Sequence, residues 1–73
     1  MQTQFKRHQT VIIKRLPDPE QIEWYGEEQP LEKGMKGTIN ILLPNGTYHV
    51  EIKDAHGEAL CYAPFDEDDL EAG

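Results

Sequence analysis

The chain has 73 residues, enough for one small domain, and fourteen acidic side chains against seven lysines and arginines give a formal net charge of −7. Nucleic-acid phosphates are bound by Lys and Arg side chains that displace counterions, so this charge argues against general nucleic-acid binding. The lone cysteine, Cys61, excludes an intramolecular disulfide and a cysteine-based zinc site, and it suits a reducing compartment.

The apolar residues are too scattered for a membrane segment. No run approaches the ~20 residues of a membrane helix, and the polar N-terminus lacks the apolar run of a signal peptide. We therefore expect a cytoplasmic protein with no membrane partner. Four cations and no acid occupy the first fifteen residues, whereas three lysines and all fourteen acids follow. Residues 1–9 are predicted as a basic N-terminal arm and residues 10–73 as a single domain.

The first predicted strand covers residues 10–16, which are rich in β-branched side chains and too few for a helix. Val11 and Ile13 are expected on one face of it. Proline cannot donate to a strand ladder, so the prolines that follow end the strand. Residues 17–33 then form a long acidic loop, in which only residues 20–25 suggest one helical turn. So long a connection in so small a domain is either functional or mobile.

A hairpin is predicted around Asn45-Gly46, a dipeptide typical of type I′ turns because both central residues need positive φ. Before it, two glycines at positions 34 and 37 indicate a turn into a strand in which Ile39, Ile41 and Leu43 share one face. After it, residues 48, 50 and 52 alternate with residues 49, 51 and 53.

The C-terminal third predicts another turn and another strand. Residues 54–57 form the turn, and residues 58–63 form a strand that Pro64 closes, with Leu60 and Tyr62 on the same face. Residues 66–73 are an acidic tail. Residues 65–71 are expected to end the chain as a short turn or 3₁₀ segment, with Phe65 and Leu70 holding the tail to the domain. A solvated tail is the ordinary fate of such a charge run, and contact with a basic partner is the alternative.

These elements predict an all-β fold, a small and partly open barrel of four to five antiparallel strands with a long loop after the first strand. Leu31–Thr38, the hairpin segment 45–52 and the turn at 54–58 together resemble a family of small bacterial domains of unknown function. The family pattern is L-x-x-G-x-x-G-T, then Y-x-V-E-F/I, then D-x-x-G. The resemblance covers about residues 10–71 and implies an SH3-like barrel without implying a function.

No catalytic, metal or cofactor site is predicted. The three histidines, His8, His49 and His56, come closest, but nothing pairs them with a nucleophile or a second ligand at a useful spacing. Cys61 is expected to be a buried, inert thiol because its neighbours are apolar. A thin barrel also has little room for a pocket with convergent titratable groups, so an enzyme is not expected.

The candidate partner-binding residues all lie in the long loop: Trp24, Tyr25, Glu23, Glu27 and Glu28. Aromatic side chains are enriched at interface hot spots, and here they stand among acids. The alternative is that the two aromatic residues fold back as a lid on the core.

Three functions follow as hypotheses. The first is a non-enzymatic interaction module that binds a protein partner through this loop. The second is an acidic inhibitor or antitoxin-like protein that masks a basic, nucleic-acid-binding site. The third is a structural protein that associates with itself, for example as a homodimer.

Overall fold

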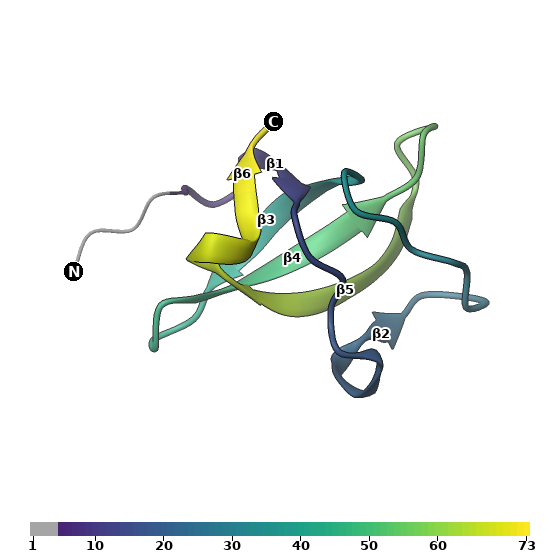
Figure 1. The fold of residues 1–73 in the computed structure, drawn as a ribbon, viewed down its shortest axis with the longest axis horizontal. Helices are drawn as coiled ribbons and strands as arrows, with labels where there is room; N and C mark the ends of the chain where they lie inside the picture. Colours follow the sequence, from purple (N-terminus) through teal and green to yellow (C-terminus); the bar gives the residue numbers. More distant parts are fainter. Residues whose placement is uncertain (1–4) are drawn as a thin grey trace.

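A computed structural model describes residues 5–73, which form strands and two short 3₁₀ turns (Figure 1). The strands are β1 (Thr10–Ile13), β2 (Glu23–Trp24), β3 (Lys36–Leu42), β4 (Thr47–Lys53), β5 (Ala59–Asp66) and β6 (Leu70–Ala72). The turns are η1 (Pro19–Gln21) and η2 (Glu67–Asp69). Neither turn, nor any other part of residues 5–73, is a helix long and apolar enough to cross a membrane.

One antiparallel sheet holds all six strands in the order β2-β5-β4-β3-β1-β6. The sheet curls so that β1 and β6 run across the direction of β4 and β5 (Figure 1). Only the two shortest strands, β2 and β6, lie at its edges, which limits the backbone exposed to other chains. The predicted all-β, partly open barrel is confirmed, with β2 and β6 bringing the strand number to six.

The core lies inside the curl and is almost wholly aliphatic and aromatic. Val11 and Ile13 of β1 are fully buried, as their alternation predicts. The alternation predicted for β4 is also confirmed, since Tyr48, Val50 and Ile52 point inward. The remaining core residues come from residue 5, β3, β5 and β6.

The described part of the predicted N-terminal arm, residues 5–9, packs on the barrel, while residues 1–4 lie outside the described residues. Phe5 is buried, with its ring edge-on to Tyr48 at 5.5 Å between centroids. The backbone continues the contact, because His8 N donates to Ile39 O and Ile39 N donates to Gln9 O. Residues 5–9 therefore complete the barrel.

The hairpin between β3 and β4 forms, but the predicted type I′ turn is wrong. Gly46 has a φ of +83°, whereas Asn45 is not in the left-handed region. Leu43 N donates to Thr47 O at 2.8 Å, and Gly46 N donates to Leu43 O at 3.2 Å. The physical reason is Pro44, which would stand beside a two-residue turn and has no N–H to close it. The chain instead uses a three-residue loop that places only glycine at positive φ.

The predicted shared face of Ile39, Ile41 and Leu43 is also wrong. Ile39 is opposite Val50, but Ile41 is opposite His49, so Asn40 is an extra residue in β3. Such a bulge reverses the alternation beyond it. Ile41 therefore lies on the outer surface, 45% exposed.

Strand β5 departs from its prediction at both ends. A second register shift lies near Leu60, so Leu60 and Cys61 are both buried while Tyr62 faces outward. Pro64 does not close the strand, which continues to Asp66. One edge of β5 faces β2, where Leu60 O accepts a hydrogen bond from Tyr25 N. The pairing with β2 does not reach Pro64, so the missing N–H of Pro64 removes no hydrogen bond from the sheet.

The turn or 3₁₀ segment predicted over residues 65–71 is limited to η2, because β5 runs to Asp66 and β6 begins at Leu70, where it pairs with β1. Phe65 and Leu70 are buried, as predicted. Arg15 Nη2 lies 2.7 Å from Asp69 Oδ2, the one ion pair within residues 5–73. This bond is the main cause of two pKa shifts: it raises the pKa of Arg15 and lowers the pKa of Asp69. The side chains of this segment carry the acidic charge, while its backbone belongs to the sheet.

Candidate functional site

The long loop after β1 is fastened to the sheet at its ends and in its middle. At its ends, Ile13 N donates to Met35 O and Gly34 N donates to Ile13 O. In its middle, β2 pairs with β5, while the predicted helical turn appears only as η1, which Asp18 caps through Glu20 N. The loop is therefore held against one side of the barrel.

Pairing of β2 sends the two candidate aromatic residues in opposite directions, because successive residues of a strand alternate between its faces. Trp24 is opposite Cys61 and packs partly buried against the core. Tyr25 lies on the outer surface and is 52% exposed. Trp24 thus folds back on the core, as the lid alternative predicts, whereas Tyr25 lies at the surface.

Although exposed, Tyr25 has a defined position. Its hydroxyl donates to Glu51 Oε2 at 2.8 Å, and its ring lies 5.5 Å from that of Tyr62, tilted by 45°. Partial desolvation, followed by the bond to the Glu51 carboxylate, raises the pKa of Tyr25 to about 12. Tyr25 is therefore a protonated donor at neutral pH, bonded to a carboxylate of β4.

The outer face of the sheet carries a row of three rings, which we call the aromatic row: Tyr25, Tyr62 and His49. The His49 ring meets the Tyr62 ring edge-on, at 4.4 Å between centroids and 73° between planes. Ile41 continues the row onto β3, because the bulge at Asn40 places it opposite His49. The row crosses from the long loop over β5 and β4.

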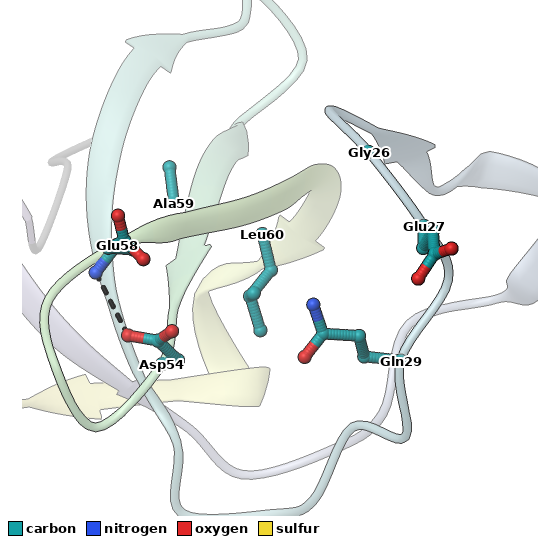
Figure 2. A pocket seen from close by; sticks show the side chains of 7 residues that line it. All are labelled: Gly26, Glu27, Gln29, Asp54, Glu58, Ala59 and Leu60. Carbon is teal, nitrogen blue, oxygen red and sulfur yellow. Dashed lines mark hydrogen bonds between the residues drawn. The ribbon is translucent and has the colours of Figure 1, made fainter.

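Beside the aromatic row, a cleft of about 330 Å³ separates the loop from the β4–β5 turn (Figure 2). Glu27 and Gln29 stand on the loop side and Asp54 and Glu58 on the turn side, with the Leu60 side chain between them. We call it the acidic cleft. Its lining is completed by Gly26 and Ala59 and includes three carboxylates and no cation.

Asp54 is built into the turn that borders the acidic cleft. Its Oδ1 accepts the amides of His56 at 2.8 Å and Glu58 at 2.9 Å, and Gly57 has a φ of +85°. The bond from the Glu58 amide is the main cause that lowers the pKa of Asp54. Asp54 is thus an anion at neutral pH and helps to fix the turn that the sequence predicts at residues 54–57.

The five predicted site residues fall in four places. Glu23 and Tyr25 share the outer face, since Glu23 is opposite Tyr62 in the β2–β5 register. Trp24 faces the core, and Glu27 enters the acidic cleft. Glu28 is exposed and does not line the cleft.

Sequence reasoning missed that Tyr25 contacts Tyr62 and Glu51, and that His49 in turn contacts Tyr62. The signal that could have found them is the outward alternation of β4, which places His49 and Glu51 on the solvent face. Tyr62 was harder to place because the register shift near Leu60 changes the alternation along β5.

The other chemistry-bearing residues are dispersed. His49 belongs to the aromatic row, and His56 lies in the β4–β5 turn. Over residues 5–73, no three His, Cys, Asp or Glu side chains are arranged to hold a metal ion. Cys61 is buried as expected, and burial raises the pKa of its thiol to about 11.

Comparisons with protein-family models, curated proteins and solved structures found no match to this chain.

Proposed function

We propose that this chain is a non-enzymatic interaction module that binds a protein partner through the aromatic row and the acidic loop beside it. The observation that carries the proposal is Tyr25, a large ring that is 52% exposed yet fixed by Glu51 and Tyr62. Aromatic anchors of this kind dominate interface energies, and a fixed ring loses little conformational entropy on binding.

The acidic surroundings of Tyr25 favour a basic partner. Glu23 shares its face and Glu27 follows it into the acidic cleft, while the nearest cations in sequence are Arg15 and Lys33. Complementary charge accelerates association and orients the partner. The same surface repels nucleic acid and anionic membrane, so we propose neither as a partner.

The finer fold and location belong to the same proposal: an SH3-like barrel of the small bacterial family type, acting in the cytoplasm. The order of elements supports the fold. A long loop follows β1, tight turns join β3 to β4 and β4 to β5, and a 3₁₀ turn leads into the last strand, which pairs with β1.

The test is capture of a partner from a nuclease-treated bacterial lysate by the tagged chain and by two variants. Tyr25→Ala removes the exposed ring, and Leu16→Ala removes another exposed apolar side chain, 43% exposed, from the same loop region. We expect a discrete protein that Tyr25→Ala loses and Leu16→Ala retains, with both variants folded by circular dichroism. Equal retention by both would refute the proposed surface.

A second candidate, the acidic inhibitor or antitoxin-like protein, is favoured by the three carboxylates of the acidic cleft. Here charge and not the ring would dominate, so binding should weaken steeply with salt. The double variant Glu27→Gln/Glu58→Gln, which removes two of these carboxylates, should then weaken capture more than Tyr25→Ala does. Asp68→Asn/Glu71→Gln removes two charges from exposed positions beyond β5 and serves as its matched control. Salt-insensitive capture would exclude this candidate.

A further inference from the structure

The outer face around Tyr25 combines ring surface with carboxylates that form no ion pair within residues 5–73, although Lys53 lies two residues beyond Glu51 on the same side of β4. Arg15–Asp69 is the one ion pair within residues 5–73, so Glu23 and Glu51 form none there. Glu51 accepts the Tyr25 hydroxyl through Oε2, and a carboxylate has lone pairs for further donors. Negative charge is therefore concentrated next to an exposed aromatic ring.

The register places these groups within one small area. Tyr62 is opposite Glu23 across the β2–β5 pair and opposite Glu51 across the β4–β5 pair. The Tyr62 ring contacts both other rings, that of His49 in an edge-on arrangement and that of Tyr25 at a tilt. Tyr25, the most exposed of the three, therefore offers its ring beside both carboxylates.

A guanidinium group matches this arrangement better than an ammonium does. It is planar and weakly hydrated, so it stacks on an aromatic ring, and its fork of N–H donors pairs with carboxylate oxygens. The ammonium group of lysine would supply the opposite charge, but only as a compact and strongly hydrated cation that cannot stack on a ring in this way. The neighbouring acidic cleft, without a cation in its lining, adds attraction for basic residues that flank the arginine.

We propose that this face binds an arginine side chain from a basic segment of a protein partner, with the guanidinium stacked on Tyr25 and paired with Glu51 and Glu23. The inference rests on the proposed interaction function and names the chemistry of its anchor. The occupant follows from charge complementarity, since the acidic surroundings of the ring disfavour a second copy of this net-negative chain.

The test is an NMR titration of the ¹⁵N-labelled full chain with short peptides of alternating glycine and arginine. The matched probes replace each arginine with citrulline, which is close in shape but neutral, or with lysine. We expect saturable shifts at Tyr25, Tyr62 and Glu51 with the arginine peptide, with affinity in the millimolar range (about −4 kcal/mol). The lysine peptide should bind more weakly, and the citrulline peptide should produce no shifts at these residues.

Variants separate stacking from charge. Tyr25→Leu and Glu51→Gln should each weaken the arginine peptide by about 2- to 5-fold, the value of an exposed cation–π contact or ion pair. Tyr25→Phe keeps the ring and should retain binding. Glu71→Gln removes one charge from β6 and should leave the affinity unchanged. Each variant's ¹⁵N spectrum checks its fold.

Two results would overturn the inference: no saturation by about 10 mM arginine peptide, or equal shifts from the arginine, lysine and citrulline probes. Its failure differs from failure of the proposed function. If a partner is captured through Tyr25 but the arginine peptide does not bind specifically, the proposed interaction function stands and the arginine anchor is rejected. Loss of both would remove the surface altogether.

Discussion

Gly37 in β3 is the glycine at which an added side-chain carbon would come closest to neighbouring atoms. It lies buried between two neighbouring strands, opposite Val11 of β1 and Ile52 of β4. A Cβ added there would stand 2.7 Å from Val50 Cγ1 and 2.9 Å from Glu51 O. Both distances are shorter than real carbon contacts, so Gly37→Ala requires a shift in β4.

The size of the effect follows from what must move. Val50 is fully buried and β-branched, with little rotamer freedom, and Glu51 O belongs to the backbone of a central strand. Overpacking of a filled core costs about 1–3 kcal/mol, and a backbone contact places Gly37→Ala in the upper half of that range. In a domain of this size, each kcal/mol lowers Tm by about 4–8 °C, so we expect a fall of roughly 10 °C or more.

The assay is urea unfolding followed by circular dichroism and by fluorescence of Trp24, the single tryptophan. Gly26→Ala is the matched control, because nothing lies within 4 Å of its added Cβ and its φ is not in the left-handed region. That control should be neutral or stabilising by about 0.4–1 kcal/mol through the unfolded chain. Unfolding free energies for the two variants within about 0.5 kcal/mol of each other, at the margin expected for surface substitutions, would refute the reasoning.

Three further predictions concern the barrel itself. Phe5→Ala should destabilise by about 2 kcal/mol or more, because it removes a buried ring packed on Tyr48; an unchanged urea midpoint would show that residues 5–9 do not complete the barrel. Cys61 should react with a thiol reagent only as fast as the chain opens, since it is buried and its pKa is raised to about 11; fast labelling of the native chain would contradict this. The folded-state pKa of Asp69 is lowered by Arg15, so its stabilisation is present above the ordinary carboxyl pKa and is lost as pH falls through the lowered value. Arg15→Gln should therefore reduce the loss of unfolding free energy on acidification, measured by urea unfolding at a series of acidic pH values. The same loss in the variant and the original chain would count against the bond.

The sequence predicted those parts of the fold that depend on local chemistry. Alternation along residues 48–52 needs only a period of two, and the turn at residues 54–57 needs an Asp and a Gly three residues apart. Asn45-Gly46 by itself predicts a type I′ turn between β3 and β4, but the preceding Pro44 is a signal against that turn. Pro44, without an N–H, is incompatible with the shorter turn and pre-sets φ for the longer one.

Other features depend on contacts between distant segments. The bulge at Asn40 inserts one residue opposite β4, and no glycine or proline announces it, so alternation alone placed Ile41 in the core. Strand β2 has only two residues and exists through pairing with β5. Likewise, the sequence identified Tyr25 and its acidic neighbours, but its contact with Glu51 spans 26 positions and needs the folded sheet.

Because β2 pairs with β5, Trp24 and Tyr25 have different roles, and only one of them is suitable for a mutational test of binding. Trp24 packs against the core opposite Cys61, so it fixes the loop, while Tyr25 one position later faces outward. Removing Trp24 would release the loop and disturb the barrel together, so lost binding would not distinguish an interface residue from a structural one. Removing Tyr25 deletes an exposed ring and leaves that anchorage in place. The stable presentation of Tyr25 thus depends on Trp24, and only a change at Tyr25 separates the binding surface from the fold that holds it.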